Sequence, residues 1–382
     1  MEASCSTPPK WEHTVDLAGK RIGVIGTGAS AIQLVPRVAR TAAHVDVYQR
    51  TPPWVVPKLD RRITRAERRL YATLPITQKA LRATIFAITE AVGVAITRYP
   101  SLLALGERWS GRHVRQAIAD PRLRAAVTPD YRLGCKRILP SNDSYPSIAR
   151  DNVTLVRDGI ERVTSRGVVT GDGAERPLDV LVCSTGFQIE EVFMHLDVRG
   201  RDGRTLTGAW ADGIEAHRGT TVAGFPNLAL LSGPNTGTGS TSQVYMIEAQ
   251  IHYVLELLAA LRRHEGGAIE PRAEAQRAYN TWLQTQMQRT VWLRGGCNSW
   301  YLDSEGVNRT LYPGPSSGFW RSLRRVRSDE YDVQPRRAPV RVPHTEPLEV
   351  SAGRRHCSLP PRPRPAVPPS HRSSAPPSPG RC

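Results

Sequence analysis

The stretch from Gly19 to Pro57 constrains the fold of this chain more than any other. It opens with the run from Arg21 to Ile25, whose apolar and partly β-branched residues predict a short buried parallel strand. The strand leads into Gly-Thr-Gly-Ala-Ser-Ala at residues 26–31, which has the G-x-G-x-x-A spacing of a dinucleotide-binding loop. In that spacing the first glycine allows a tight turn, the second lets the backbone approach a pyrophosphate, and the small last residue lets the helix pack on the strand.

The residues that follow predict a strand–helix–strand unit. Apolar residues recur at helical spacing between 29 and 39, and residues 45–49 alternate like a second strand. Free N–H groups and the positive dipole end of that helix point at the loop, which favours an anion there. An ordinary strand–turn–helix without a ligand is the alternative, and the surrounding pattern favours the dinucleotide. We therefore predict a Rossmann-type α/β fold with three layers, and a pyrophosphate site formed by Gly26, Thr27, Gly28, Ala29 and Ser30.

The end of the second predicted strand indicates which dinucleotide is bound. An NAD enzyme carries an acidic residue there for the ribose 2′-hydroxyl, whereas this chain has Arg50 and Thr51. A carboxylate would repel a 2′-phosphate, and a guanidinium forms forked hydrogen bonds to it. The pair predicts NADP(H) rather than NAD.

Length and charge limit the other function classes. With 382 residues the chain is long enough for two domains with separate cores. Its formal net charge of +17 is compatible with nucleic acid, an anionic membrane, or a polyanionic cofactor in an Arg-rich protein. No nucleic-acid motif is present, and the longest apolar stretch, 83–96, contains Glu90 and is too short to span a bilayer. We favour the cofactor and expect neither a nucleic-acid nor a membrane partner.

The six cysteines are scattered and show no C-x-x-C spacing. That distribution argues against a metal site and against a disulfide framework, so a reducing cytoplasm is the expected compartment. The first residues of the sequence also lack the apolar core of a signal peptide.

Changes in pattern along the chain predict its organisation. Residues 60–127 are Arg-rich with helical spacing, and we interpret their charges as a solvated face, with a functional patch as the alternative. After Val326 the chain is rich in Arg, Pro and Ser and is expected to be disordered, with PxxP docking as an alternative. The expected segments are a connector at 1–18, the nucleotide-binding domain at 19–59 and 128–186, a helical insert at 60–127, a second domain at 187–325 and a tail at 326–382.

The second domain repeats the strand, glycine loop and helix pattern. Residues 228–231 predict a buried strand, residues 233–239 form a glycine-rich loop, and a helix is expected from about Ser242 to His264. The arrangement predicts either a second cofactor edge or a tight helix entry with no ligand. The helix is expected to pack through an apolar stripe made by Ile247, Ile251, Val254, Leu258 and Leu261.

Several motifs, in this order, resemble Baeyer-Villiger-type flavin monooxygenases across about residues 11–320. They are GTGASAIQ and YQRTPPWVVP between residues 26 and 57, LGCKR at 133–137, STGF at 184–187, GPNTGTG at 233–239, MIEAQ at 246–250, GGCNSWYLD at 295–303 and LYPG at 311–314. The resemblance implies that 187–325 is the C-terminal remnant of a FAD-type α/β domain. It also implies a soluble enzyme that uses NADPH, FAD and O2 to insert one oxygen atom into a ketone, or to oxidise a heteroatom, through a flavin C4a-peroxide.

The resemblance also assigns roles to single residues. Arg137 matches the catalytic arginine held against the flavin, where a fixed cation stabilises developing negative charge. Lys136 joins Arg50 and Thr51 around the 2′-phosphate, and Trp300 matches an indole that donates to the nicotinamide-side ribose. Thr185 and Gly186 lie in the STGF turn that borders the cofactor. A surface charge pair is the alternative interpretation of the two basic residues at 136 and 137.

Some features depart from the family pattern. Relatives carry a further glycine fingerprint and the signature F-x-G-x-x-x-H-x-x-x-W before the NADPH strand. If Trp11 is the tryptophan of that signature, its other positions hold Thr7, Ala3 and Met1, and Ser240 stands where relatives often have histidine. We therefore expect a truncated and impaired monooxygenase that holds NADPH but little FAD. An NADP(H)-binding protein without oxygenase activity, or a small NADPH reductase serving a partner flavoprotein, are the alternatives.

Overall fold

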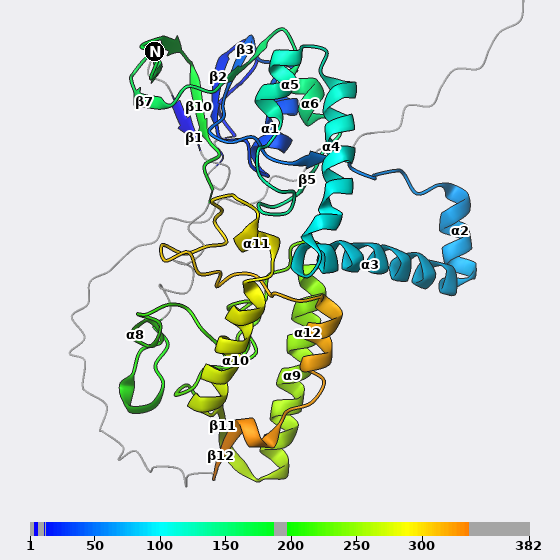
Figure 1. Cartoon of the computed structure of the whole chain (residues 1–382), viewed down its shortest axis with the longest axis vertical. Coiled ribbons are helices and arrows are strands. Elements are labelled where there is room, and N and C mark those ends of the chain that lie inside the picture. The colour runs from blue at the N-terminus through cyan, green and yellow to red at the C-terminus, as the bar shows by residue number, and fades with distance from the viewer. Residues whose placement is uncertain (1–3, 7–10, 12, 187–196, 336–382) are drawn as a thin grey trace, which may run out of the picture. The chain divides into compact units, whose positions relative to one another are not determined.

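A computed structural model describes residues 4–6, 11, 13–186 and 197–335 (Figure 1). Contacts divide the chain into residues 1–336 and 337–382. The second unit, which holds most of the predicted tail, lies outside the described residues, as does Phe187 of the STGF turn.

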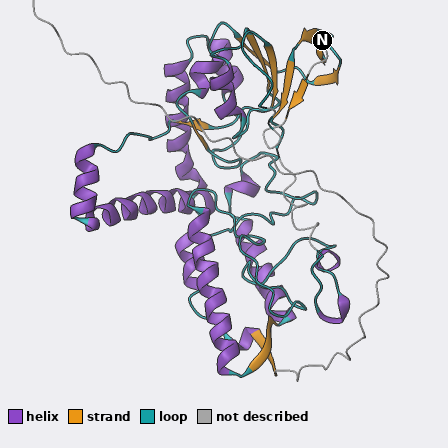
Figure 2. Cartoon of the chain, turned by 180° about the vertical axis from the view of Figure 1, so that it is seen from behind, coloured by secondary structure: helices purple, strands orange, loops and turns teal. Residues whose placement is uncertain are grey.

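The predicted Rossmann-type sheet is confirmed as a five-stranded parallel sheet with the strand order β1-β10-β2-β3-β6. Its central strands bury apolar side chains on both faces, as strands of a parallel sheet do. Helices lie beside these strands (Figure 2). The strands are β1 (Ser4–Ser6), β2 (Arg21–Ile25), β3 (His44–Tyr48), β6 (Val153–Val156) and β10 (Val180–Cys183). The connector expected at 1–18 is therefore wrong in part, because β1 pairs with β10 at the sheet edge.

Helix α1 (Ala31–Val38) packs on the sheet through the face that its sequence period predicts, with Ile32, Val35 and Val38 buried. It contacts β3 and the short helix α6 (Ser144–Ile148). Three antiparallel strands form a separate small sheet, with a turn at Gly173 in the left-handed region. They are β7 (Ile160–Val163), β8 (Gly167–Thr170) and β9 (Glu175–Pro177).

The segment expected to be a helical insert contains four α-helices. Thr64 caps the first of them in a reciprocal capping box with Glu67, and Asp120 caps the last through the N–H groups of residues 122 and 123. The helices are α2 (Arg65–Thr73), α3 (Pro75–Thr97), α4 (Leu103–Ala117) and α5 (Pro121–Val127), with the 3-10 turn η1 (Pro100–Leu102) between the second and third. Two short strands, β4 (Val55–Val56) and β5 (Leu139–Pro140), pair on either side of the insert.

The C-terminal part of the described chain is mainly helical. It contains η2 (Arg201–Gly203), α8 (Leu206–Ala209), α9 (Gln243–Arg263), α10 (Ala273–Met287), α11 (Val291–Arg294) and α12 (Ser316–Ser322), followed by η3 (Ser328–Glu330). Strands β11 (Gly266–Pro271) and β12 (Tyr331–Pro335) form an antiparallel pair. The predicted start of the tail at residue 326 is therefore wrong, because Tyr331 is buried and β12 is paired.

Two further predictions for this part are wrong. Residues 228–231 form no strand, since no neighbouring strand pairs with them in the described chain, and Leu231 is exposed. Helix α9 has the predicted ends, but it buries a different face, which includes Met246, Tyr253 and Leu257. Ile251 and Leu258 of the predicted stripe are exposed.

By length and composition alone, α3 and α9 would each be able to cross a bilayer, a property that core helices of soluble proteins share.

Candidate functional site

The loop at residues 26–31, called the glycine loop below, has the backbone that its sequence predicts. Gly26 has a φ of 102°, and a Cβ at this position would lie 2.5 Å from the carbonyl oxygen of Ser184. No other residue fits there, because both the conformation and the close approach exclude a side chain. A Cβ on Gly28 would meet nothing within 4 Å, so the loop remains open at its second glycine. The space above that backbone is what a pyrophosphate needs.

The N-terminus of α1 faces this open side of the loop. Ser30 occupies the N-cap position, but among the described residues no side chain caps the helix, and the first turn carries no acidic residue. Gly28 and Ala29 are exposed. The N–H groups of Ile32 and Gln33 donate to the carbonyls of Gly28 and Ser30, whereas those of residues 28–31 make no hydrogen bond within the described chain. These loop N–H groups and the positive end of the helix dipole are thus available to an anion.

A hydrogen bond connects the glycine loop to the predicted 2′-phosphate residues. The hydroxyl of Thr27 donates to the carbonyl of Thr51 over 3.2 Å. Arg50, which precedes this carbonyl, is exposed. The end of β3 is therefore held beside the loop that follows β2, as the strand–helix–strand unit predicts.

The positive charge of Arg50 acts on Lys136, although the two residues are 86 positions apart in the sequence. Burial lowers the pKa of Lys136, and the positive charge of Arg50 lowers it further. Lys136 Nζ also lies 5.1 Å from the centre of the Tyr131 ring. Two neighbouring cations, one of them partly desolvated, destabilise each other until an anion binds between them.

Tyr131 holds these two segments together. Its hydroxyl donates to the carbonyl of Pro52 over 2.9 Å, and its own carbonyl accepts from Trp54 Nε1 over 2.8 Å. Tyr131 and Trp54 belong to a buried cluster that also contains residues of α3, α10 and α11. The sequence analysis missed Tyr131. Its position shortly before the LGCKR motif, together with Trp54 in the RTPPW motif, was the signal that could have identified it.

A disulfide joins the segment of Lys136 to the loop at residues 295–303, called the Trp300 loop below. Cys135 and Cys297 are bonded, with their Cα atoms 6.1 Å apart and their sequence positions separated by 162. The N–H of Arg132 donates to the carbonyl of Gly295 over 2.9 Å and reinforces the link. The expectation that the cysteines form no disulfide framework is therefore wrong for this pair. The signal was present, since each cysteine lies inside one of the quoted motifs, but spacing alone does not show it.

Arg137 and Trp300 lie on the two sides of this link. Trp300 is 51% exposed and its ring centre lies 4.4 Å from that of Tyr301. Burial raises the pKa of Tyr301 to about 12, and the charge of Arg137 opposes that rise. Arg137 itself is exposed. The structure thus gathers Arg137, Lys136 and the Trp300 loop, while no described contact joins Trp300 to the glycine loop.

The STGF turn borders the glycine loop from the other side. The carbonyl of Ser184 lies against Gly26, and the next two residues, Thr185 and Gly186, are exposed. Gly186 has a φ of 110°, which favours glycine. The exposed turn is therefore placed beside the predicted pyrophosphate position.

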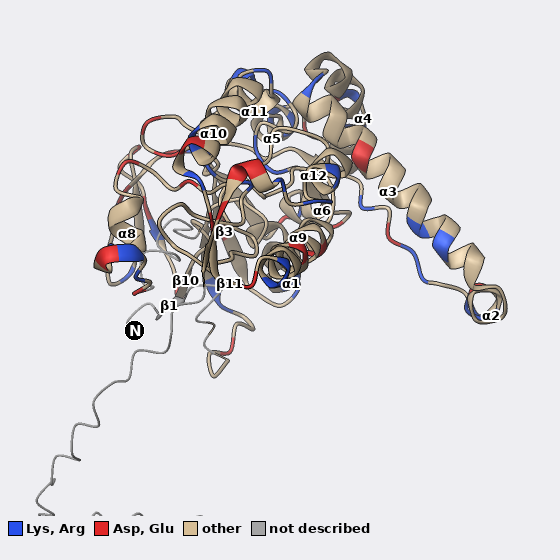
Figure 3. Ribbon diagram, turned by 90° about the horizontal axis from the view of Figure 1, so that it is seen from below, with Lys and Arg blue, Asp and Glu red and all other residues tan. Residues whose placement is uncertain are grey.

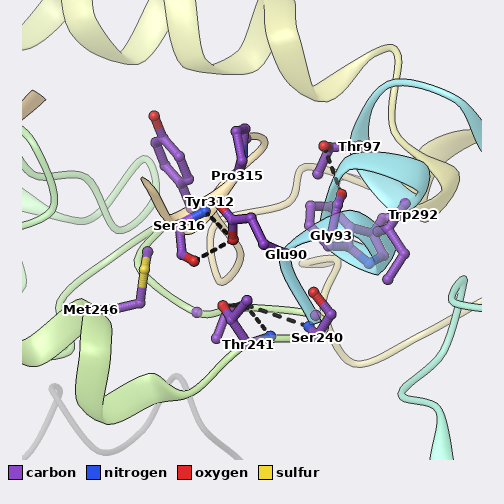
Figure 4. A pocket seen from close by; sticks show the side chains of 15 residues that line it. Glu90, Gly93, Thr97, Ser240, Thr241, Met246, Trp292, Tyr312, Pro315 and Ser316 are labelled. Atoms are coloured by element: carbon purple, nitrogen blue, oxygen red, sulfur yellow. Dashed lines mark hydrogen bonds between the residues drawn. The ribbon is translucent and has the colours of Figure 1, made fainter. Parts of the chain in front are cut away.

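The second glycine-rich loop is closed (Figure 4). The hydroxyl of Thr238 accepts from the N–H groups of Ser240 and Thr241, so these donors are occupied. The loop packs on α3, where a Cβ on Gly93 would lie 2.8 Å from Ser240 Oγ. The cavity between them measures about 10 Å³, which is space for about one water molecule. Of the two interpretations left open by the sequence, this geometry favours the tight helix entry.

No group of three or more His, Cys, Asp or Glu side chains in the described part of the chain is placed to hold a metal ion.

Comparisons with known proteins agree on one group of enzymes. No protein-family model matches the chain. It is 48% identical over 306 residues to a Baeyer-Villiger monooxygenase of Pseudomonas aeruginosa, covering 80% of this chain and 58% of that protein. It is 46% identical over 334 residues to a Baeyer-Villiger monooxygenase of Streptomyces coelicolor, covering 87% and 64%. A FAD-binding monooxygenase of Aspergillus niger is 35% identical over 330 residues, covering 83% and 53%.

A solved structure shows the same fold. An oxidised steroid monooxygenase bound to NADP superimposes with a TM-score of 0.75 at 25% identity, covering 87% of this chain and 70% of that one. The chain spans 58% and 64% of the lengths of its two bacterial relatives.

Proposed function

Because the chain belongs to the Baeyer-Villiger monooxygenase family, we propose that it supplies the NADPH side of an active site that inserts one oxygen atom from O2 into a ketone, or oxidises a heteroatom. The products would be an ester or lactone in the first case and an oxide in the second. This proposal concerns the whole enzyme, of which the chain spans 58% in one relative and 64% in another.

The observation that carries the proposal is the pair of cations beside the open glycine loop. The pyrophosphate of NADPH would lie over Gly28 at the N-terminus of α1, where free N–H groups face it. The 2′-phosphate would lie between Arg50 and Lys136, where its charge removes their mutual repulsion. The residues present therefore fit NADP(H), and Trp300 is exposed for contact with the nicotinamide-side ribose.

The described residues fit FAD less well than NADPH. In relatives, FAD supplies the activation of O2, and one relative is named as FAD-binding. In this chain the second glycine-rich loop has its N–H donors occupied by Thr238 and leaves a cavity of about 10 Å³. We therefore derive no step through FAD. The closed loop favours, as a second candidate, an NADP(H)-binding protein without oxygenase activity.

Arg137 is the proposed catalytic residue. It is an exposed cation whose charge acts on Tyr301, on a segment that the disulfide holds to the Trp300 loop. A guanidinium fixed there would stabilise negative charge that develops on the oxygen of a substrate carbonyl.

The test separates the two candidates. The purified chain is titrated with NADPH by fluorescence, scanned for flavin absorbance, and assayed for NADPH-dependent O2 consumption with a phenyl ketone in the presence of added FAD. We expect NADPH to bind and little FAD to copurify. Ketone-dependent oxygen uptake identifies the monooxygenase, NADPH binding without uptake identifies the second candidate, and failure to bind NADPH refutes both.

A further inference from the structure

Helix α3 exposes large apolar side chains along most of its length. Ile76, Ile85 and Ile88 are 67, 55 and 60% exposed, and Leu81 and Val92 also face solvent. Only residues 95–97, at its C-terminal end, are buried. A run of exposed isoleucines and leucines on one helix marks a surface that binds something apolar.

The side of α3 that carries Phe86 and Glu90 faces away from Leu81, Ile85, Ile88 and Val92 and is fastened to the protein. The Glu90 carboxylate accepts hydrogen bonds from Ser316 Oγ over 2.6 Å and from the N–H of Ser317 over 2.7 Å. The ring centres of Phe86 and Tyr245 lie 4.9 Å apart. The helix is therefore fixed in orientation, with its apolar side outward, and it is not free to insert across a bilayer.

The apolar surface of α3 is wide. Within the helix the only charged residues are Lys79, Arg82 and Glu90, and at 100° per residue they fall within about 80° of its circumference. The rest is made of Ala, Ile, Leu, Val, Phe, Gly and Thr, apart from Pro75 and Gln78. A contact with one partner helix would need only a narrow apolar stripe. The wide apolar surface of α3 is better suited to contact with the apolar part of a lipid layer.

Helix α2 and the segment before it supply positive charge next to this surface. Lys58 pairs with Asp60, and Arg61 pairs with Glu67. Four further arginines are exposed and make no ion pair with the described residues, namely Arg62, Arg65, Arg68 and Arg69. Helix α2 contacts α3, and Figure 3 shows α3 extending toward α2 with basic segments along its length.

We propose that α2 and α3 dock this protein on an anionic membrane surface, with α3 lying in the interface and the α2 arginines at lipid phosphates. A basic segment beside an apolar helix that lies flat is the pattern of interfacial anchors. Pairing with a second copy in parallel would bring the two arginine clusters together, which their charge opposes. This inference is independent of the proposed function, since neither helix contributes to the NADPH site.

The experiment measures cosedimentation of the full chain with vesicles. One set contains phosphatidylcholine alone, and the other contains phosphatidylcholine with phosphatidylglycerol. Binding is expected to the anionic set only and to weaken with salt. Each basic residue near an anionic leaflet contributes about fivefold to binding, so four Arg→Gln changes at 62, 65, 68 and 69 should weaken it about 600-fold.

Matched variants keep the outcome interpretable. Ile85→Gln with Ile88→Gln should also abolish binding, and Val163→Gln, an equally exposed change on β7, should not. The charge control changes four exposed arginines of the nucleotide-binding part to Gln, at 150, 157, 162 and 166. Unchanged NADPH affinity shows that each variant folds. Three outcomes would overturn the proposal. They are equal vesicle binding by the α2 variant and its charge control, no vesicle binding at all, and a dimer in sedimentation velocity that the Ile85/Ile88 variant abolishes.

Discussion

Removal of the Arg50 guanidinium should weaken NADPH binding without weakening NADH binding. A hydrogen bond to a charged group contributes about 1.5–3 kcal/mol, and Arg50 is exposed, so the lower half of that range applies. A loss of about 2 kcal/mol corresponds to about 30-fold in Kd for Arg50→Ala. NADH has no 2′-phosphate, so its Kd should change by less than about twofold.

Lys136→Ala tests the same site from the partly buried side. Screening by water is weaker there, so we expect a loss near the upper end of the range, about 3 kcal/mol or about 150-fold for NADPH. The double variant should lose less than the sum of the two, because each single change also relieves the repulsion that lowers the pKa of Lys136. Arg50→Ala alone should return that pKa toward its ordinary value.

The assay is a fluorescence titration of each variant with NADPH and with NADH at low and at high salt. Arg40→Ala is the matched control, because Arg40 is also exposed but follows the C-terminal end of α1, away from the glycine loop. Equal losses for the two nucleotides, or an equal loss in the control, would show that the 2′-phosphate does not lie between Arg50 and Lys136.

The remaining predictions concern the glycine loop, the disulfide and a buried histidine. Gly26→Ala should abolish NADPH binding or lower stability by several kcal/mol, because its Cβ would meet the Ser184 carbonyl at 2.5 Å and its φ is positive; an unchanged melting temperature and Kd would contradict this. Cys135→Ser with Cys297→Ser should lower the free energy of unfolding by up to about 5 kcal/mol, since the closed loop is long, and denaturant unfolding of the oxidised chain with and without reductant gives the comparison. Burial, and then the charge of Arg218, lower the pKa of His217 to about 4, so the folded state prefers the neutral ring. The unfolded chain then binds the extra proton, and stability should be complete above about pH 6.5 and fall by about 3 kcal/mol as pH drops to 4. His217→Gln should flatten that slope in denaturant midpoints measured across this window.

Local patterns in the sequence predicted the nucleotide-binding half well because its determinants are short-range. The period of Ile32, Val35 and Val38 defines one face of α1, and the glycine spacing before it defines the turn. The ends of α9 were predicted to within a residue. Each of these follows from residues fewer than about five positions apart on a helix or strand.

Where the outcome depended on a distant partner, the sequence was misleading. Residues 228–231 have strand composition, but no strand of the described chain pairs with them, so they remain irregular. Both faces of α9 carry apolar residues, and contacts with Phe319 and Tyr331 decide that the face of Met246 and Tyr253 is the buried one. The bond between Cys135 and Cys297 crosses 162 residues, a distance over which cysteine spacing carries no information.

The basic residues of the chain also show that local sequence cannot predict which distant residues come together. A net charge of +17 left three classes of partner open, and a cofactor was favoured because the sequence contains no nucleic-acid motif and no apolar stretch long enough to span a bilayer. In the structure, Arg50 and Lys136 come from distant segments of the chain, and the pKa of Lys136 is lowered first by burial and then by the charge of Arg50. The arginines of α2 converge on nothing in the described chain and adjoin an exposed apolar helix. We therefore propose different anions for the two groups of basic residues, a single phosphate for the first and an extended anionic surface for the second.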